Sequence, residues 1–156
     1  MEAENGEAGR MVDTILIVDD EEDMARLFKR TLEPALGCVV RTALSGQKAL
    51  AILEKDPVDL VLLDVKMPGM DGLEVLERIH RDHPWLTVVM MTAHGTIELA
   101  VQAIKMGAYD FITKPFEHDA LVWHITKALE RSRLLRENMV LQLRVLQTQA
   151  FRNIVG

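Results

Sequence analysis

Cysteine is almost absent from this chain, in which Cys38 is the single one among 156 residues. One thiol cannot form an internal disulfide, and the sequence holds no group of cysteines and histidines at the spacing of zinc ligands. Because Cys38 stands in an apolar stretch, we interpret it as a small core residue rather than a nucleophile.

Aromatic residues, net positive charge and long apolar runs are scarce as well. Phe, Trp and Tyr make up 4% of the chain and the formal net charge is −6, whereas nucleic-acid surfaces are usually basic and often carry stacking rings. No stretch is apolar for long enough to span a bilayer, and the acidic first ten residues do not resemble a signal peptide. We therefore expect a soluble, cytoplasmic protein without direct contact to nucleic acid or membrane, with residues 1–13 as a disordered leader.

What the chain does contain is a regular alternation of short apolar runs and helical patterns. The runs are rich in Val, Ile and Leu, which is typical of strands buried on both faces. They are Thr14–Val18, Cys38–Ala43, Val58–Leu63, Leu86–Met91 and Ala108–Thr113. Five strands that alternate with five helices predict an α/β fold, a doubly wound parallel sheet for which the flavodoxin-like order 2-1-3-4-5 is the commonest small solution.

Several residues indicate where the helices begin and end. The first helix is predicted to close at Pro34, and Ser45 and Asp71 are expected to cap the second and third helices at their N-termini. The fifth helix is predicted to run from about Glu117 to about Ala150, which makes it an extended C-terminal helix.

Polar side chains follow four of the five predicted strands. Asp19 and Asp20 follow the first strand, Asp64 the third, Thr92 the fourth and Lys114 the fifth. In the order 2-1-3-4-5 these strands are neighbours, and ligands of such sheets bind beyond the carboxyl ends of the strands. Three carboxylates placed together repel one another, so the cluster needs a cation, and oxygen ligands open to solvent suit Mg²⁺. With the metal and Lys114 neutralising the developing charge, Asp64 can attack a phosphoryl group while Thr92 donates to a phosphoryl oxygen.

Each of these residues also has an ordinary structural interpretation. Asp19 and Asp20 suit a helix N-terminus, and Asp64 suits a turn. A single threonine or lysine is more often structural or solvated than catalytic. The coincidence of all of them at four neighbouring strand ends favours the functional interpretation.

Four stretches of the sequence resemble the receiver domain of two-component response regulators. They are Ile17–Glu21, Leu62–Gly72, Met91–Ala93 and Gly107–Phe116. The resemblance spans residues 14–131 and implies a CheY-like version of the predicted fold. It implies that Asp64 accepts a phosphoryl group from a sensor histidine kinase, and that Asp19, Asp20 and Asp64 bind Mg²⁺ together with the backbone carbonyl of Lys66.

The resemblance also implies a conformational switch made of Thr92 and Phe111. We assign the aromatic position to Phe111 because it lies three residues before Lys114, and we interpret Tyr109 as a packing residue at the start of the fifth strand. The peptide bond from Lys114 to Pro115 is implied to be cis.

Two further residues lie close to the predicted site. Lys66 and His94 stand two residues beyond Asp64 and Thr92, at positions that in the family flank the phosphoryl group and tune its hydrolysis. For His94 a solvated loop residue remains an equally good interpretation.

The fifth helix is longer than a receiver domain needs, and residues 132–150 are predicted to form a linker. Mostly apolar residues recur there in steps of four and three, which predicts a seam of a two-stranded coiled coil and a homodimer through helix 5 and the linker. The seam is Leu121, Ile125, Ala128, Ser132, Leu135, Met139, Gln142, Leu146 and Gln149. A single amphipathic helix docked on a neighbour is the other interpretation.

Residues 151–156 resemble the entry to the central ATPase domain of NtrC-type activators, which work with the sigma-54 form of RNA polymerase. The receiver motifs also resemble that family, including the C4-dicarboxylate transport regulators. This implies a longer transcription activator with ATPase and DNA-binding domains after the chain. Since no Walker-A loop lies within these 156 residues, we do not expect them to hydrolyse ATP. The resemblance to receivers implies a signalling domain that catalyses only its own phosphorylation and dephosphorylation.

Two alternatives differ from this interpretation. A phosphatase of the haloacid-dehalogenase type would carry Asp-x-Asp after its first strand, whereas here Asp64 follows the third and Lys66 replaces the second carboxylate. A stand-alone receiver that uses its long helix only to dimerise is the second alternative.

Overall fold

The computed structural model describes residues 12–155, so most of the predicted leader lies outside the described residues. Strands and helices alternate along the whole chain. In order they are β1 (Thr14–Val18), α2 (Glu22–Leu36), β2 (Val39–Ala43), α3 (Gly46–Lys55), β3 (Leu60–Asp64), α4 (Gly72–Asp82), β4 (Thr87–Thr92), α5 (Ile97–Lys105), β5 (Asp110–Thr113) and α6 (His118–Val155).

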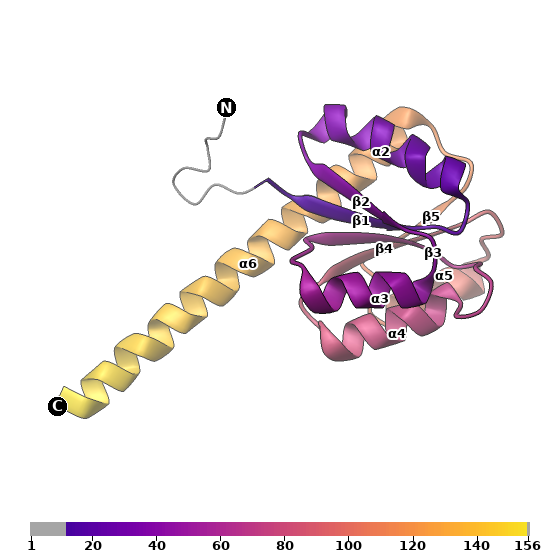
Figure 1. Cartoon of the computed structure of the whole chain (residues 1–156). Helices are drawn as coiled ribbons and strands as arrows, with labels where there is room; N and C mark the ends of the chain where they lie inside the picture. Colours follow the sequence, from indigo (N-terminus) through magenta and orange to yellow (C-terminus); the bar gives the residue numbers. More distant parts are fainter. Residues whose placement is uncertain (1–11, 156) are drawn as a thin grey trace.

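The five strands form one parallel sheet in the order β2-β1-β3-β4-β5, which confirms the predicted fold. Helices α3, α4 and α5 cover one face, and α2 and the first part of α6 cover the other (Figure 1). Successive residues of a strand point to opposite faces, so Leu16 and Val18 pack under α3 and α4 while Ile15 and Ile17 pack under α2 and α6. Every residue of β3 and β4 is buried, as expected for central strands of a sheet covered on both faces.

The helix ends are set by local side chains, and one of them differs from the prediction. Ser45 and Asp71 accept hydrogen bonds from the N–H groups of Lys48 and Glu74, at 3.2 and 3.0 Å, and so cap α3 and α4 as predicted. The predicted end of the first helix at Pro34 is wrong, because α2 continues to Leu36.

Pro34 lies inside α2 and lacks the N–H that would donate to the carbonyl of Arg30, four residues earlier, so it costs the helix one backbone hydrogen bond. Gly37 then ends the helix in the left-handed conformation, with φ 62°, and its N–H donates to the carbonyl of Glu33. A glycine adopts this backbone conformation without strain from a Cβ atom.

Helix α6 is 38 residues long, starts one residue after Glu117 and continues five residues beyond Ala150. Its first half packs on the sheet, and its second half leaves the domain as a rod (Figure 1). Residues 151–155, which the sequence assigns to the start of another domain, still belong to this helix. Within residues 12–155 no helix is both long and apolar enough to cross a membrane.

The predicted coiled-coil seam does not run along one exposed face of α6. Its first four positions, Leu121, Ile125, Ala128 and Ser132, are buried inside the domain. The three apolar ones belong to the core between the sheet and α2, where α6 contacts β3, β4 and α2. The same steps of three and four therefore record packing within one chain over this part of the helix, which corrects that part of the predicted seam.

A group of four charged residues fixes α6 to the amino-terminal edge of the sheet, and we call it the basal cluster. Its members are Asp13, Asp59, Arg133 and Arg136. The Arg136 guanidinium contacts Asp59 at 2.8 Å and Asp13 at 3.3 Å, and Arg133 contacts Asp13 at 2.6 Å. Both carboxylates are mostly buried, so the cluster sets the direction in which α6 leaves the domain.

Candidate functional site

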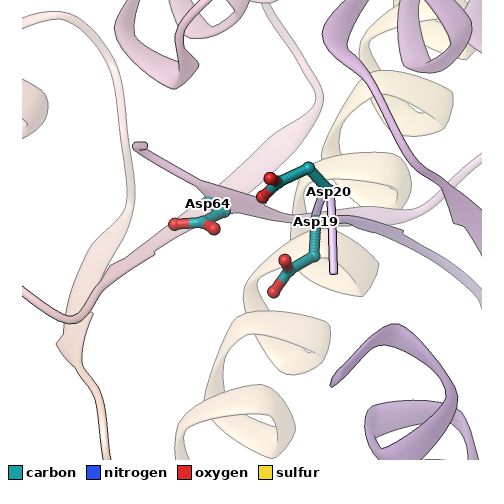
Figure 2. A group of neighbouring side chains, drawn as sticks. All are labelled: Asp19, Asp20 and Asp64. Atoms are coloured by element: carbon teal, nitrogen blue, oxygen red, sulfur yellow. The ribbon is translucent and has the colours of Figure 1, made fainter. Parts of the chain in front are cut away.

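Three carboxylates meet at the carboxyl-terminal edge of the sheet. Asp19 and Asp20 follow β1 and Asp64 ends β3, and these two strands are neighbours. One carboxylate oxygen from each residue lies within 4.8 Å of the others, and Figure 2 shows the three side chains grouped at the strand ends. Asp19 is fully buried and Asp64 nearly so, while Asp20 is exposed and leaves the cluster open to water.

The Lys114 side chain places a positively charged ammonium group next to this cluster. Its Nζ lies 3.1 Å from Asp19 and 3.6 Å from Asp64, and its side chain is 10% exposed. The Lys114 N–H donates to the Thr92 carbonyl at 2.7 Å, and its peptide bond to Pro115 is cis, as the resemblance implied. Three carboxylates and one ammonium group leave two negative charges uncompensated.

The remaining negative charge changes the ionisation of Asp64. Burial raises the pKa of Asp64 above its usual carboxyl value, and the carboxylates of Asp19 and Asp20 raise it further. The Lys114 ammonium and the Lys66 N–H, which lies 3.3 Å from the Asp64 carboxylate, act in the opposite direction. A divalent cation among the three carboxylates would balance the charge and favour ionised Asp64.

The chemistry of the donor atoms fits such a cation. All three groups offer carboxylate oxygens, which are ligands of hard divalent metals, and the exposed Asp20 leaves room for bound water. Asp19 also accepts a hydrogen bond from the Glu21 N–H at 2.9 Å, which fixes the orientation of its carboxylate. The cluster can therefore hold a metal ion, and the carbonyl of Lys66 as a further ligand stays a prediction.

Thr92 and Phe111 lie on the two strands beyond β3. Thr92 ends β4, is fully buried, and its hydroxyl oxygen accepts a hydrogen bond from the His94 N–H at 3.2 Å. Phe111 lies in β5 and is partly buried against the core under α3, α4 and α5. Tyr109 does not start β5 as a packing residue: it lies before the strand with its side chain 38% exposed, and the Arg131 guanidinium lies 5.1 Å from its ring centroid.

Two glycines shape the site, and neither was assigned a role from its position in the sequence. A Cβ atom on Gly72 would collide with the backbone carbonyl of Asp64 and lie 2.6 Å from Cα of Val65, so only glycine lets α4 begin this close to the end of β3. A Cβ atom on Gly95 would lie 2.6 Å from the Thr113 hydroxyl and 3.3 Å from the Phe111 ring. The only sequence signal is that each glycine follows a strand end that bears a site residue.

The structure thus brings Asp19, Asp20, Asp64 and Lys114 into one cluster, with Thr92 at the end of the next strand. Phe111 is paired in register with Met90, two residues before Thr92 on β4. His94 lies two residues after Thr92 in an exposed loop, and its N–H donates to the Thr92 hydroxyl oxygen.

Comparisons with known proteins agree with this arrangement. The family described as "Response regulator receiver domain" matches residues 15–126. The nitrogen assimilation regulatory protein NtrX of Azorhizobium caulinodans is 49% identical over 129 residues, which are 81% of this chain and 28% of that protein. The C4-dicarboxylate transport transcriptional regulatory protein DctD of Rhizobium meliloti is 43% identical over 129 residues, 83% of this chain and 28% of that protein.

A solved structure shows the same similarity in three dimensions. The crystal structure of NtrX from Brucella abortus superposes with a TM-score of 0.77 at 45% identity, and the match covers 84% of this chain and 30% of that one. The chain spans less than a third of the length of these relatives. From the family match over residues 15–126, together with the sheet order and the cluster around Asp64, the chain belongs to the response regulator receiver domain family.

Proposed function

We propose that a carboxylate oxygen of Asp64 takes a phosphoryl group from the phosphohistidine of a sensor histidine kinase. The oxygen forms a bond to phosphorus while the phosphorus–nitrogen bond to the histidine breaks, so that Asp64 becomes an acyl phosphate. The observation that carries the proposal is the position of Asp64 at the end of β3, beside Asp19, Asp20 and Lys114.

The charges around Asp64 support a Mg²⁺-dependent reaction. Mg²⁺, held by Asp19, Asp20, Asp64 and the Lys66 carbonyl, would neutralise charge that develops on the phosphoryl oxygens. The Lys114 ammonium, 3.6 Å from Asp64, is placed to contact a phosphoryl oxygen on the same carboxylate. Thr92 has a hydroxyl hydrogen left to donate, because its oxygen is the acceptor in its bond with His94.

This chemistry makes the domain a signalling element rather than a phosphatase with substrates of its own. A phosphatase with an aspartate nucleophile uses a second carboxylate two residues later as its acid and base, and Lys66 stands at that position here. Without that group the acyl phosphate would persist, which suits a signal. His94, if it lies beside the phosphoryl group, would tune the rate of hydrolysis.

Phosphorylation would be transmitted through Thr92 and Phe111. The added negative charge attracts the Thr92 hydroxyl, and the space that it vacates lets the Phe111 ring turn inward. Phe111 lies in β5, between α5 and the start of α6, so this movement would reshape the surface of these elements. Helix α6 would carry the change to a homodimer and to the domains that follow.

The greater length of the relatives supports a longer protein, since the chain spans 28% of both NtrX and DctD. We place a sigma-54-type ATPase domain and a DNA-binding domain after α6, in a cytoplasmic transcription activator controlled by this receiver. A stand-alone receiver with a dimerisation helix is the alternative, and the exposed second half of α6 suits both.

The test of the proposal is labelling of the chain with acetyl phosphate in the presence of Mg²⁺. Wild type should gain one hydroxylamine-sensitive phosphoryl group and Asp64→Asn none. Asp71→Asn is the matched control, because asparagine keeps the N-cap of α4 and the substitution removes one nearby negative charge outside the cluster. Stoichiometric labelling of Asp64→Asn at a hydroxylamine-sensitive site would assign the phosphoacceptor elsewhere.

Two further variants test the metal and the switch. Asp20→Ala should weaken the Mg²⁺ dependence of labelling, since it removes one of few protein ligands. Thr92→Ala should still accept phosphate on Asp64 but lose most of the change in dimerisation that beryllium fluoride induces in wild type, measured by sedimentation. A sedimentation profile of wild type that ignores bound beryllium fluoride would contradict the proposed coupling.

A further inference from the structure

Strand β5 presents its residues alternately to the two sides of the sheet. Phe111 packs against the core under α3, α4 and α5, whereas Ile112 belongs to the core under α2 and α6. Asp110, which precedes Phe111, also reaches α6, because its Oδ2 lies 2.7 Å from Nδ1 of His124. A movement of the Phe111 ring on one side of β5 therefore has a direct neighbour through which it can act on the other side.

Each carboxylate oxygen of Asp110 has a partner of its own. Oδ1 accepts a hydrogen bond from the Phe111 N–H at 2.8 Å, and Oδ2 contacts the His124 ring. The side chains of Asp110 and His124 are 30% and 29% exposed, so water competes only in part for their contact. A single carboxylate thus connects the backbone of Phe111 to the second turn of α6.

Further along α6, Arg131 fixes the helix to a different strand. Its guanidinium donates to the Thr87 hydroxyl at 3.0 Å, and Thr87 is the fully buried first residue of β4. The same guanidinium lies over the ring of Tyr109, whose N–H donates to the Val88 carbonyl of β4 at 2.8 Å. Arg131 stands seven residues beyond His124, about 10 Å along the helix.

These two attachments differ in how freely they can move. Strand β4 pairs on both sides and is buried throughout, whereas β5 is an edge strand that pairs with β4 alone. The contact at Arg131 is therefore a fixed point, while the contact at His124 follows β5. A shift of β5 would tilt the first turns of α6 about Arg131.

We propose that Asp110 and His124 are positioning residues that carry the movement of Phe111 to α6. Their contact turns a shift of β5 into a tilt of the helix. The inference rests on the phosphorylation of Asp64 in the proposed function and names the contact through which it acts on α6. Neither side chain belongs to the carboxylate cluster, so loss of either one leaves the labelling of Asp64 intact.

Trp123 is a native reporter of this contact. Its ring meets the His124 ring edge on, with 5.2 Å between the ring centroids, and its side chain is 58% exposed. The chain has two tryptophans, so Trp85→Phe leaves Trp123 as the only one. In this parent variant, acetyl phosphate and Mg²⁺ should change the emission of Trp123 in step with the labelling of Asp64. The same variant with Asp64→Asn is the blank.

A matched pair of histidine substitutions tests the link in the parent variant. His124→Phe keeps an aromatic ring beside Trp123 but cannot bond to Asp110, so it should lose most of the emission change while it is labelled like the parent. His118→Phe is the control, because the contact of His118 with the fully exposed Asp119, at 3.1 Å, lies within the first turn of α6. It should keep the whole emission change.

Two substitutions of Asp110 decide the question independently, including the case in which His124→Phe fails to fold. Asp110→Ala removes both contacts and should lose most of the emission change. Asp110→Asn can still accept from the Phe111 N–H and donate to a neutral His124 ring, so it should keep most of the change.

The outcomes separate this inference from the proposed function. A full emission change in His124→Phe or in Asp110→Ala would overturn the inference, and so would equal losses in His124→Phe and His118→Phe. A parent variant that is labelled on Asp64 without any change in Trp123 emission would overturn it as well, while the phosphoacceptor role stands. Absence of labelling in the parent would instead refute the proposed function, and the inference with it.

Discussion

Replacement of Asp64 by asparagine should stabilise the folded chain in the absence of divalent cations. The wild-type site holds an almost buried carboxylate beside the fully buried Asp19, with one lysine between them. Asparagine has nearly the same shape and no charge, so the substitution removes the charge while it preserves the packing at the end of β3.

The magnitude follows from the distances in the site. At an effective dielectric constant of about 20, unit charges on Asp19 and Asp64, 4.8 Å apart at most, repel by roughly 3.5 kcal/mol. The Lys114 ammonium, 3.6 Å from Asp64, attracts it by roughly 4.6 kcal/mol under the same assumption. The residual attraction of roughly 1 kcal/mol is smaller than the several kcal/mol that burial of a carboxylate costs. We expect Asp64→Asn to raise the free energy of unfolding by about 1–2 kcal/mol and the thermal midpoint by roughly 2–8 °C.

The dependence on pH has a definite sign. Because burial raises the pKa of Asp64, the folded chain keeps a proton on this carboxyl at pH values where the unfolded chain has lost it. The stability of metal-free wild type should therefore fall as pH rises from the usual carboxyl pKa through the raised one, and this contribution should be constant above it. Asp64→Asn should lack this fall.

The assay is thermal unfolding followed by circular dichroism, with EDTA and with Mg²⁺. A ligand at ten times its dissociation constant stabilises the folded state by about 1.4 kcal/mol, so Mg²⁺ should raise the midpoint of wild type and raise that of Asp64→Asn less. Asp71→Asn is the control for the loss of one negative charge outside the cluster. Its thermal midpoint should match that of wild type both with EDTA and with Mg²⁺. The reasoning is refuted if metal-free wild type is as stable as Asp64→Asn, or if Mg²⁺ stabilises both equally.

Three other predictions concern the rest of the molecule. Arg136→Gln removes the cation that bridges the two carboxylates of the basal cluster and should lower the free energy of unfolding in urea by about 1–2 kcal/mol, whereas Arg144→Gln, further along α6, should change it by less than about 0.5 kcal/mol. Gly72→Ala should destabilise by about 2 kcal/mol or more, because its Cβ collides with backbone, while Gly69→Ala meets no atom within 4 Å and should cost only about 1 kcal/mol for its positive φ; equal losses would contradict the contact described. Burial raises the pKa of the Cys38 thiol, so a thiol reagent followed by absorbance at pH 8 should react at least about a hundred times more slowly with native than with urea-unfolded protein.

The sheet was predictable because its strands are continuous apolar runs and its order is the commonest solution for five alternating units. The first and last residues of the strands and helices were less predictable. The third strand begins at Leu60 rather than Val58, because Asp59 turns both its N–H and its carboxylate to the backbone of Thr14 at the foot of the sheet. The end of α2 was missed because Pro34 lacks only its own N–H, while Gly37 beyond it still donates to the Glu33 carbonyl.

The charged residues of the site were predictable for a related reason. Parallel strands bring their carboxyl ends to one edge, so Asp19, Asp64 and Lys114 could be placed together from their positions after strands alone. The roles of Gly72 and Gly95 could not, because they depend on the distance between a loop and a strand end from different parts of the chain. No local sequence pattern predicts the distance between that loop and that strand end.

Helix α6 shows where periodicity stops being informative. Leu121, Ile125 and Ala128 repeat in the same steps as a coiled-coil seam, because an apolar stripe has one spacing whether a sheet of the same chain or a second helix covers it. The fold decides between them for this part of the helix, because the stripe lies in the core of its own chain, where α6 contacts β3, β4 and α2.

The same fold limits how the proposed phosphorylation of Asp64 would affect α6. Strand β3 connects the two ends of the domain, since Asp64 closes it and Asp59, just before it, contacts Arg136 at the root of α6. Every residue of β3 is buried and the strand is paired on both sides, so a shift along it would disturb the whole core. The outer route through Thr92 and Phe111 to the edge strand β5 disturbs far less packing. We therefore expect the basal cluster to stay fixed on phosphorylation while the start of α6, next to β5, moves against it.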